Sequence, residues 1–280
     1  MPTRLAPAKV NLGLHVLRRR PDGFHDLATV FLPLGWSDRL TAEPAERWSL
    51  TTTDPALPTD GGNLVTRAAR ALAAHAGTGT GARVHLDKRV PYGAGLGSGS
   101  SDAAATLRLL SDLWRLDLPH ADLARLALDL GSDVPFFLDA VAAHGTGRGE
   151  RLAPLEGEGG GPYRCPFWLV VAVPAVHVST ATAFSGVTPD GGDRPDLAAA
   201  VVSNDLARWR RELTNDFQPS VEAAHPEVRV VRQSLEGRGA GLAALSGTGS
   251  AVVGVFEAEA PARAAARAVS ETCRVWVEAP

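Results

Sequence analysis

A glycine-rich segment in the middle of the chain carries the strongest chemical signal in the sequence. It reads Pro91-Tyr92-Gly93-Ala94-Gly95-Leu96-Gly97-Ser98-Gly99-Ser100-Ser101-Asp102, between a strand-like segment at 84–90 and an alanine-rich helical one at 100–115. Glycines let the backbone turn sharply, so that successive N–H groups can face an anion. A helix N-terminus adds unpaired N–H donors and can bind phosphate without a lysine. The segment therefore predicts a phosphate-binding loop. The alternative, a flexible linker, seldom lies between a strand and a well-patterned helix.

Three better-known glycine motifs do not fit this segment. A Walker A loop requires a lysine, and the segment contains none. The dinucleotide-binding fingerprint fails because Ser98 and Ser100 stand where its third glycine is required. The nucleophile elbow of hydrolases is also absent. The loop is therefore expected to bind phosphate in a different sequence context.

Two further positions could take part in phosphoryl transfer to a hydroxyl group. That chemistry uses a carboxylate to orient the hydroxyl and accept its proton, and a cation to offset developing negative charge. Asp133 precedes the apolar residues 134–137, where a helix or turn cap is the alternative interpretation. Lys9 is one of only two lysines and shares a strand face with Asn11. Its alternative is a solvated residue on an edge strand.

The hydrophobic pattern predicts the elements that would position these residues. In the first half we expect strands over 4–17, 25–34, 39–42, 48–52 and 84–90, and helices over 63–75, 100–115 and 119–130. A Gly- and Pro-rich stretch at 156–162 is the expected domain boundary. Beyond it we expect strands over 167–173, 241–245, 251–256 and 273–277, two helices after the first strand, and a helix over 260–270. This order suits an α+β sandwich with helices on one face of an antiparallel sheet.

Three glycine-containing segments between these elements have more than one interpretation. Residues 145–150 could form a hairpin turn or a loop beside a phosphate, and residues 245–250 could form a hairpin turn that a ligand approaches closely. Residues 187–196 are expected to form a mobile surface loop, which could be an active-site lid or an inert loop.

The bulk composition narrows the function classes. The chain has 280 residues, 45% hydrophobic and 21% charged, which is ordinary for a globular protein. A net charge of −3 argues against a nucleic-acid-binding module. Cys165 and Cys273 stand alone, so neither a disulfide framework nor a structural zinc site is expected. No signal peptide or membrane span is predicted, and we expect a cytoplasmic protein.

Six segments, taken together and in order, resemble the GHMP kinase superfamily. They are residues 6–12 (APAKVNL), 22–25 (DGFH), 63–69 (NLVTRAA), 91–101, 131–137 (GSDVPFF) and 245–249 (LSGTG). The resemblance implies a two-domain α+β fold, with an N-terminal ribosomal-protein-S5-like domain and a C-terminal ferredoxin-like α/β sandwich. It places an ATP-binding domain at 1–157 and a second domain at 158–280. Within the superfamily, the segments are most similar to members that phosphorylate the 2-hydroxyl of a cytidine-diphosphate-linked methylerythritol in isoprenoid precursor synthesis.

The same resemblance implies roles for individual residues. Asp133 would be the catalytic base and Lys9 its charged partner. ATP would be bound by Asn63, Pro91, Tyr92, Gly93, Ala94, Gly95, Leu96, Gly97, Ser98, Gly99, Ser100 and Ser101. The substrate would be bound by Asn11, Phe24, His25 and Thr180. ATP and Mg²⁺ are the expected cofactors, with no metal ligands assigned, since phosphates and water can hold the ion.

The chain departs from the common family pattern at three places, none of which removes a proposed catalytic group. Phe24 replaces a frequent tyrosine, Ser98 interrupts a run of glycines, and Asp102 stands where asparagine is common. The alternatives are a related kinase acting on homoserine, mevalonate or a sugar, and a nucleotide-binding regulatory protein that has lost catalysis. The expected partner is a small-molecule substrate, with no nucleic acid and no membrane, and the sequence leaves the oligomeric state open.

Overall fold

The structure, a computed structural model, describes all residues from Met1 to Pro280 and divides them into two compact units. The first unit contains Met1–Ala8, Gly35–Pro91 and Gly97–Ala140, and the second contains Lys9–Leu34, Tyr92–Leu96 and Val141–Pro280. Each unit is therefore assembled from separate stretches of sequence. These units do not coincide with the predicted domains 1–157 and 158–280, and that boundary stays a prediction.

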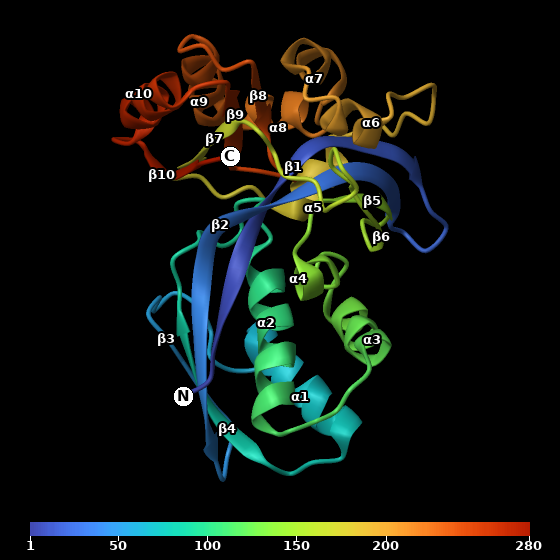
Figure 1. Cartoon of the computed structure of the whole chain (residues 1–280), viewed down its shortest axis with the longest axis vertical. Coiled ribbons are helices and arrows are strands. Elements are labelled where there is room, and N and C mark those ends of the chain that lie inside the picture. The colour runs from blue at the N-terminus through green and yellow to red at the C-terminus, as the bar shows by residue number, and fades with distance from the viewer. The chain divides into compact units, whose positions relative to one another are not determined.

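The first unit combines strands with four helices (Figure 1). Residues 39–45 of β2 (His25–Ala45) pair antiparallel with β4 (Gly81–Asp87), and β3 (Ser49–Thr52) pairs parallel with β4. The helices are α1 (Leu64–Ala76), α2 (Ser98–Leu113), α3 (His120–Leu130) and α4 (Phe136–Asp139). Strands and helices both contribute fully buried leucines to the core of this unit, which include Leu40, Leu72, Leu86, Leu107 and Leu110.

Strand β2 is one long strand where the sequence predicted two. Its buried side chains alternate through the expected gap, from Leu34 and Trp36 through Asp38 to Leu40 and Ala42. A period of two keeps the same face of the strand turned inward, so the strand continues without a turn. Asp38 is therefore a charged residue inside a buried apolar row.

The second unit contains the remaining strands and helices. Residues 9–19 of β1 (Thr3–Arg19) lie in this unit, as do residues 25–34 of β2, its partner strand. Residues 27–31 of β2 pair with β5 (Ala143–Gly147), which forms a hairpin with β6 (Arg151–Pro154). Residues 145–150 thus include a hairpin turn, which confirms the first of the two interpretations of that segment.

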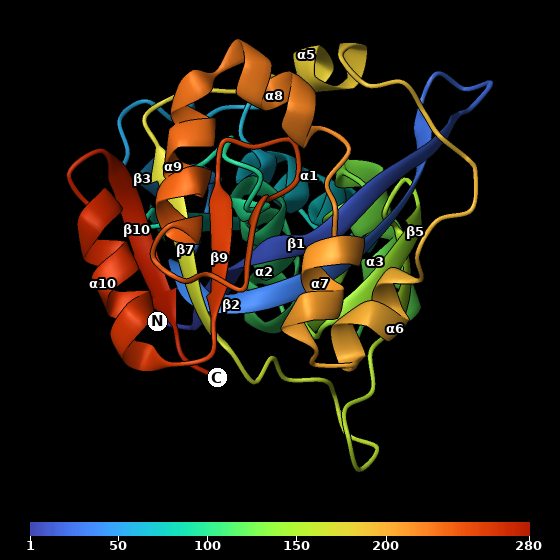
Figure 2. The same ribbon diagram turned by 90° about the horizontal axis from the view of Figure 1, so that it is seen from above.

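A second sheet has the order β10-β7-β9-β8 and is antiparallel throughout. Its strands are β7 (Trp168–Pro174), β8 (Leu242–Leu245), β9 (Val252–Phe256) and β10 (Cys273–Glu278). Figure 2 shows α9 (Pro226–Glu236) and α10 (Glu259–Val269) over one face of this sheet. The predicted arrangement of helices on one face of an antiparallel sheet is confirmed, and residues 245–250 form the predicted turn between β8 and β9.

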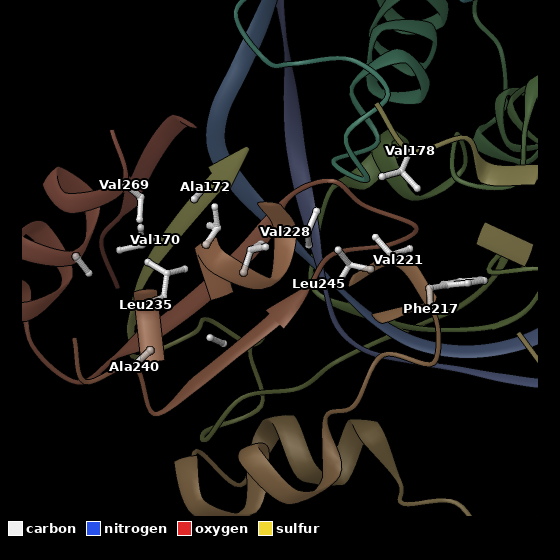
Figure 3. Packing of buried hydrophobic residues seen from close by; sticks show 14 of the residues in the cluster. Val170, Ala172, Val178, Phe217, Val221, Val228, Leu235, Ala240, Leu245 and Val269 are labelled. Carbon is white, nitrogen blue, oxygen red and sulfur yellow. The ribbon is translucent and has the colours of Figure 1, made fainter. Parts of the chain in front are cut away.

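The core of the second unit lies between this sheet and its helices. Val170 and Ala172 of β7 meet Val228 and Leu235 of α9 in the apolar cluster of Figure 3. Burial of such side chains stabilises the fold by about 1.5–3 kcal/mol for each large residue. The other helices of this unit are α5 (Thr180–Ser185), α6 (Leu197–Val202), α7 (Leu206–Glu212) and α8 (Gln218–Ala224).

The predicted surface loop at 187–196 contains no helix or strand, but it is attached to the second unit at two points. The Asp190 N–H donates to the Val16 carbonyl at 3.0 Å. Arg194 forms a bidentate ion pair with Asp216, at 2.8 and 3.2 Å.

None of the helices combines the length and the apolar character that crossing a bilayer requires.

Candidate active site

The glycine-rich segment leads into helix α2, as the sequence predicted. Gly93, Gly95 and Gly97 have φ values of 68°, 79° and 68°, a region that favours glycine. Gly97 is the N-cap of α2 and offers no side chain to the first N–H groups, which stay available to a ligand. Helix α2 thus begins at Ser98, two residues before the predicted start. The Ser98 hydroxyl donates to the Pro91 carbonyl at 3.3 Å.

Asn63 is the N-cap of α1, and its amide is engaged in the fold. Its Oδ1 accepts from the Val65 N–H at 2.9 Å, and its Nδ2 donates to the Pro58 carbonyl at 2.8 Å. These bonds give Asn63 a structural role that the sequence analysis did not assign. Its predicted contact with ATP stays a prediction.

Lys9 and Asn11 lie together in the interior of the second unit. The Lys9 ammonium donates to Asn11 Oδ1 at 2.6 Å and to the Gly95 carbonyl at 3.0 Å. Lys9 is 3% exposed, which rules out the alternative of a solvated edge residue. The ammonium also lies 5.4 Å from the centre of the Phe31 ring. The only lysine of this unit therefore contacts the backbone of the glycine-rich segment.

Two hydroxyl residues complete this buried cluster, and the prediction of site residues omitted both. Thr29 accepts from Asn11 Nδ2 at 2.8 Å and donates to the Gly13 carbonyl at 2.6 Å. Ser246 accepts from the Asn11 N–H and donates to the Gly95 carbonyl, both at 3.1 Å. Ser246 stands in the 245–250 turn, so the small side chains of that turn were the signal available in the sequence. No sequence signal marks Thr29.

Phe24 immediately precedes β2 and His25 is its first residue, and each lies beside a partner from a distant part of the chain. The His25 ring stacks on Phe184 with centroids 4.8 Å apart, and Phe184 in turn meets Phe217 edge-on. The Phe24 ring is 52% exposed, and the guanidinium of Arg148 lies 4.6 Å from its centre. Phe184 and Arg148 are therefore additional candidates that the sequence analysis missed.

Ion pairs hold the turn that precedes these aromatic residues. Arg20 contacts Asp22 at 2.8 Å and Asp26 at 3.1 Å, and Arg18 contacts Asp26 at 2.5 Å. Hydrogen bonds from Arg20 lower the pKa of Asp22, and those from Arg18 and Arg20 lower the pKa of Asp26. Both carboxylates therefore stay charged near neutrality and fix the turn, although exposed pairs of this kind stabilise a fold only weakly.

Thr180 is the first residue of α5 and is exposed. Its hydroxyl lies 3.4 Å from that of Thr248, a residue of the 245–250 turn. The structure thus places Thr180 beside the turn that contains Ser246.

Asp133 lies in the first unit, between α3 and α4. The N-cap of α4 is Pro135, so Asp133 is not the N-cap of the helix that follows it. Val134, Phe136 and Phe137 are buried and anchor the segment around it. Because Asp133 belongs to the first unit and Lys9 to the second, their pairing stays a prediction.

Metal-ligating side chains do not gather anywhere in the structure: no group of three His, Cys, Asp or Glu residues could hold an ion.

Comparisons with known proteins agree with this reading of the chain. The model of the GHMP kinase N-terminal domain matches residues 63–140, and that of the GHMP kinase C-terminal domain matches residues 197–275. The 4-diphosphocytidyl-2-C-methyl-D-erythritol kinase of Salinibacter ruber is 55% identical over 93% of this chain and 92% of its own length. The protein of the same name from Chlorobium luteolum is 45% identical over 93% of this chain and 90% of its own length.

Solved structures give the same result. A crystal structure of a 4-(cytidine 5'-diphospho)-2C-methyl-D-erythritol kinase is 39% identical, with a TM-score of 0.82, and the match covers 99% of this chain and 98% of that one. A homoserine kinase from Cytophaga hutchinsonii shares the fold. It is 18% identical, with a TM-score of 0.75, and the match covers 99% of this chain and 94% of that one. The chain therefore belongs to the 4-diphosphocytidyl-2-C-methyl-D-erythritol kinase family of the GHMP kinases.

Proposed function

We propose that the protein is an ATP-dependent kinase that phosphorylates the 2-hydroxyl of 4-diphosphocytidyl-2-C-methyl-D-erythritol, in non-mevalonate isoprenoid precursor synthesis. The observation that carries the proposal is the buried Lys9 ammonium, which contacts Asn11 and the Gly95 carbonyl of the glycine-rich segment. Burial of an ammonium is costly in desolvation, so a lysine kept in the interior is suited to neutralising negative charge that develops in a reaction. The relatives of this chain are named as kinases, and a role in phosphoryl transfer would explain why the Lys9 ammonium is buried.

In the proposed reaction, the phosphates of ATP lie along residues 91–101. Backbone N–H groups at the start of α2 bind the phosphate oxygens, helped by the positive end of the helix dipole. The 2-hydroxyl oxygen of the acceptor bonds to the γ-phosphorus, while the bond from that phosphorus to the bridging oxygen breaks and ADP leaves. The hydroxyl proton passes to Asp133, and Lys9 offsets the negative charge that builds up.

The cytidine end of the acceptor would bind at the aromatic residues of the second unit. Phe24 offers an exposed face for stacking, and His25 is held by its own stack on Phe184. His25 would hydrogen-bond the cytosine base, while Asn11 and Thr180 would contact the rest of the substrate.

Mg²⁺ would accompany ATP and not occupy a preformed protein site. The absence of any cluster of three ligating side chains gives no cage for a resident ion. Magnesium commonly keeps several waters and binds through substrate phosphates, which suits this arrangement. We place the protein in the cytoplasm, where ATP and the nucleotide-linked acceptor are available, and assign it no nucleic-acid partner.

The direct test is ADP release from purified protein with ATP and magnesium. The acceptors compared are the cytidine-diphosphate-linked methylerythritol, homoserine, mevalonate and galactose. Turnover on the cytidine compound alone is expected. Turnover on another acceptor would retain the kinase chemistry and refute the cytosine pocket, whereas no turnover on any of the four would favour a regulatory nucleotide-binding protein.

A further inference from the structure

The second lysine of the chain lies in a buried charged cluster of the first unit. The Lys88 ammonium donates to Asp38 Oδ2 at 2.6 Å and to Asp102 Oδ2 at 2.7 Å. The three side chains are 4%, 0% and 5% exposed, respectively. One ammonium therefore lies between two carboxylates, and the cluster carries one excess negative charge when both are ionised.

The cluster links three elements around the glycine-rich segment. Asp38 stands in the buried row of β2, Lys88 follows the end of β4, and Asp102 is the fifth residue of α2. Asp38 Oδ1 also accepts from the Arg89 N–H at 2.5 Å and the Val90 N–H at 2.8 Å. Residues 88–90, which precede Pro91, and helix α2, which follows Gly97, are thus joined by the ion pairs and hydrogen bonds of the same three side chains.

Stability alone does not account for this cluster. Replacing a buried ion pair by apolar residues of similar volume is often neutral or stabilising, because removing charges from water is costly. The two carboxylates also differ. Asp38 uses both of its oxygens, whereas Asp102 Oδ1 is buried without a hydrogen-bond partner. A carboxylate oxygen left unpartnered in the interior suits a group that can take up a proton.

We propose that Lys88 and Asp102 are positioning residues for nucleotide binding, which hold the first turns of α2 against β2 and β4 so that the N–H groups of the phosphate loop stay in place. The inference rests on the proposed function, which places the ATP phosphates along residues 91–101. Neither side chain is required to touch the nucleotide.

The charge of the cluster gives this role a measurable signature. Burial, with the nearby Asp38 carboxylate, raises the pKa of Asp102 to about 7, and Lys88 opposes the rise. Lys88 and Asp38 are the charged groups that act on Asp102. Below that pKa the cluster is neutral, and above it the cluster is negative. Phosphates at the start of α2 favour the neutral form, so nucleotide binding should be accompanied by proton uptake.

The test is titration calorimetry of ADP binding to the full chain at about pH 6 and about pH 8. Asp102→Ala removes the anchor and should weaken ADP binding roughly 10- to 100-fold at both pH values, as loss of an oriented group does. Asp102→Asn keeps an acceptor for Lys88 and carries no charge. It should bind ADP near neutrality about as tightly as the unmodified protein, but without proton uptake. Because ADP titrates identically in every experiment, the difference between Asp102→Asn and the unmodified protein isolates the cluster.

Ser111→Ala is the matched control. It removes a buried hydrogen bond to the Leu116 carbonyl at the other end of α2, so it should leave ADP affinity unchanged. If Asp102→Ala binds ADP as tightly as the unmodified protein, or loses no more affinity than Ser111→Ala, the cluster is only structural and the inference is wrong. If Asp102→Ala does not fold, identical proton uptake by Asp102→Asn and the unmodified protein would equally refute it.

Failure of the proposed function is a separate result. If the variants show the expected ADP binding and the cytidine-linked acceptor is not phosphorylated, the acceptor assignment fails and the inference stands. If the unmodified protein does not bind ADP, both fail.

Discussion

Replacing Gly95 by alanine tests the close packing of the glycine-rich segment in the second unit. A Cβ atom at this position would lie 2.1 Å from the Ser246 carbonyl oxygen and 3.1 Å from the Gly249 nitrogen. A carbon–oxygen contact ordinarily needs about 3.3 Å. Both obstacles are backbone atoms, so a side-chain rotation cannot relieve the contact. The turn at 245–250 would have to move away from Gly95 by roughly 1 Å.

The cost can be worked out in three parts. A non-glycine residue at φ +79° costs about 1–2 kcal/mol. Forcing an extra methyl group into a packed site adds about 1–3 kcal/mol. Moving Ser246 also weakens its hydrogen bonds to the Asn11 N–H and the Gly95 carbonyl, each worth about 1 kcal/mol, and a loss of half of that energy adds about 1 kcal/mol. We expect a loss of roughly 3–6 kcal/mol in the free energy of unfolding.

Urea unfolding followed by tryptophan fluorescence measures this loss, and two other glycines separate its causes. Gly239 has φ +90° with open space around it, so Gly239→Ala should cost only about 1–2 kcal/mol. Gly79 has open space and no positive φ, so Gly79→Ala should change stability by less than about 1 kcal/mol. A loss for Gly95→Ala no larger than that for Gly239→Ala would refute the close approach of Gly95 and Ser246.

The remaining predictions concern catalysis, substrate binding, a buried ion pair and pH. Asp133→Ala should lower turnover about 10²- to 10⁴-fold with ADP affinity retained, and near-normal turnover would exclude Asp133 as the base. The control Asp139→Ala, at an exposed position six residues further along, should keep most of the activity. His25→Ala should raise the KM for the cytidine-linked acceptor with little change in the KM for ATP, and an unchanged acceptor KM would contradict the cytosine pocket. Glu222→Ala removes the 2.5 Å ion pair with Arg232 and leaves that guanidinium, 17% exposed, with Glu236 at 2.7 Å as an ion-pair partner. It should cost about 1–3 kcal/mol by urea unfolding, while a loss of less than about 0.5 kcal/mol would show that Glu236 and solvent replace the pair. Burial and Arg194 lower the pKa of His15 from its ordinary 6.5, so the stability that neutral His15 contributes is complete above pH 6.5 and is lost as the pH falls. The melting temperature of His15→Asn should therefore fall less on acidification below pH 6.5 than that of the unmodified protein, and an equal fall would contradict this.

The sequence by itself determined the local elements and the type of chemistry. Alternation along residues 4–17 predicted β1, and the helical period after the glycines predicted α2, because these signals arise from residues close together in the chain. The glycine-rich segment predicted phosphate binding because left-handed φ values are available to few other residues, and Gly93, Gly95 and Gly97 adopt them. Resemblance of six segments to a known family identified the kinase activity.

Only the tertiary structure decided which polar residues share an environment. Asn11 meets Ser246 across 235 positions of sequence, and Lys88 meets Asp38 across 50. No local pattern encodes such contacts, since they depend on how distant elements pack. Nor did the sequence predict the burial of either lysine. A lysine on an alternating strand is expected to face solvent, and only the packing of other elements over the strand shows that it is buried. The sequence thus specified the segments and their chemistry, and long-range packing selected the partners that make Lys9 and Lys88 charged groups of the interior.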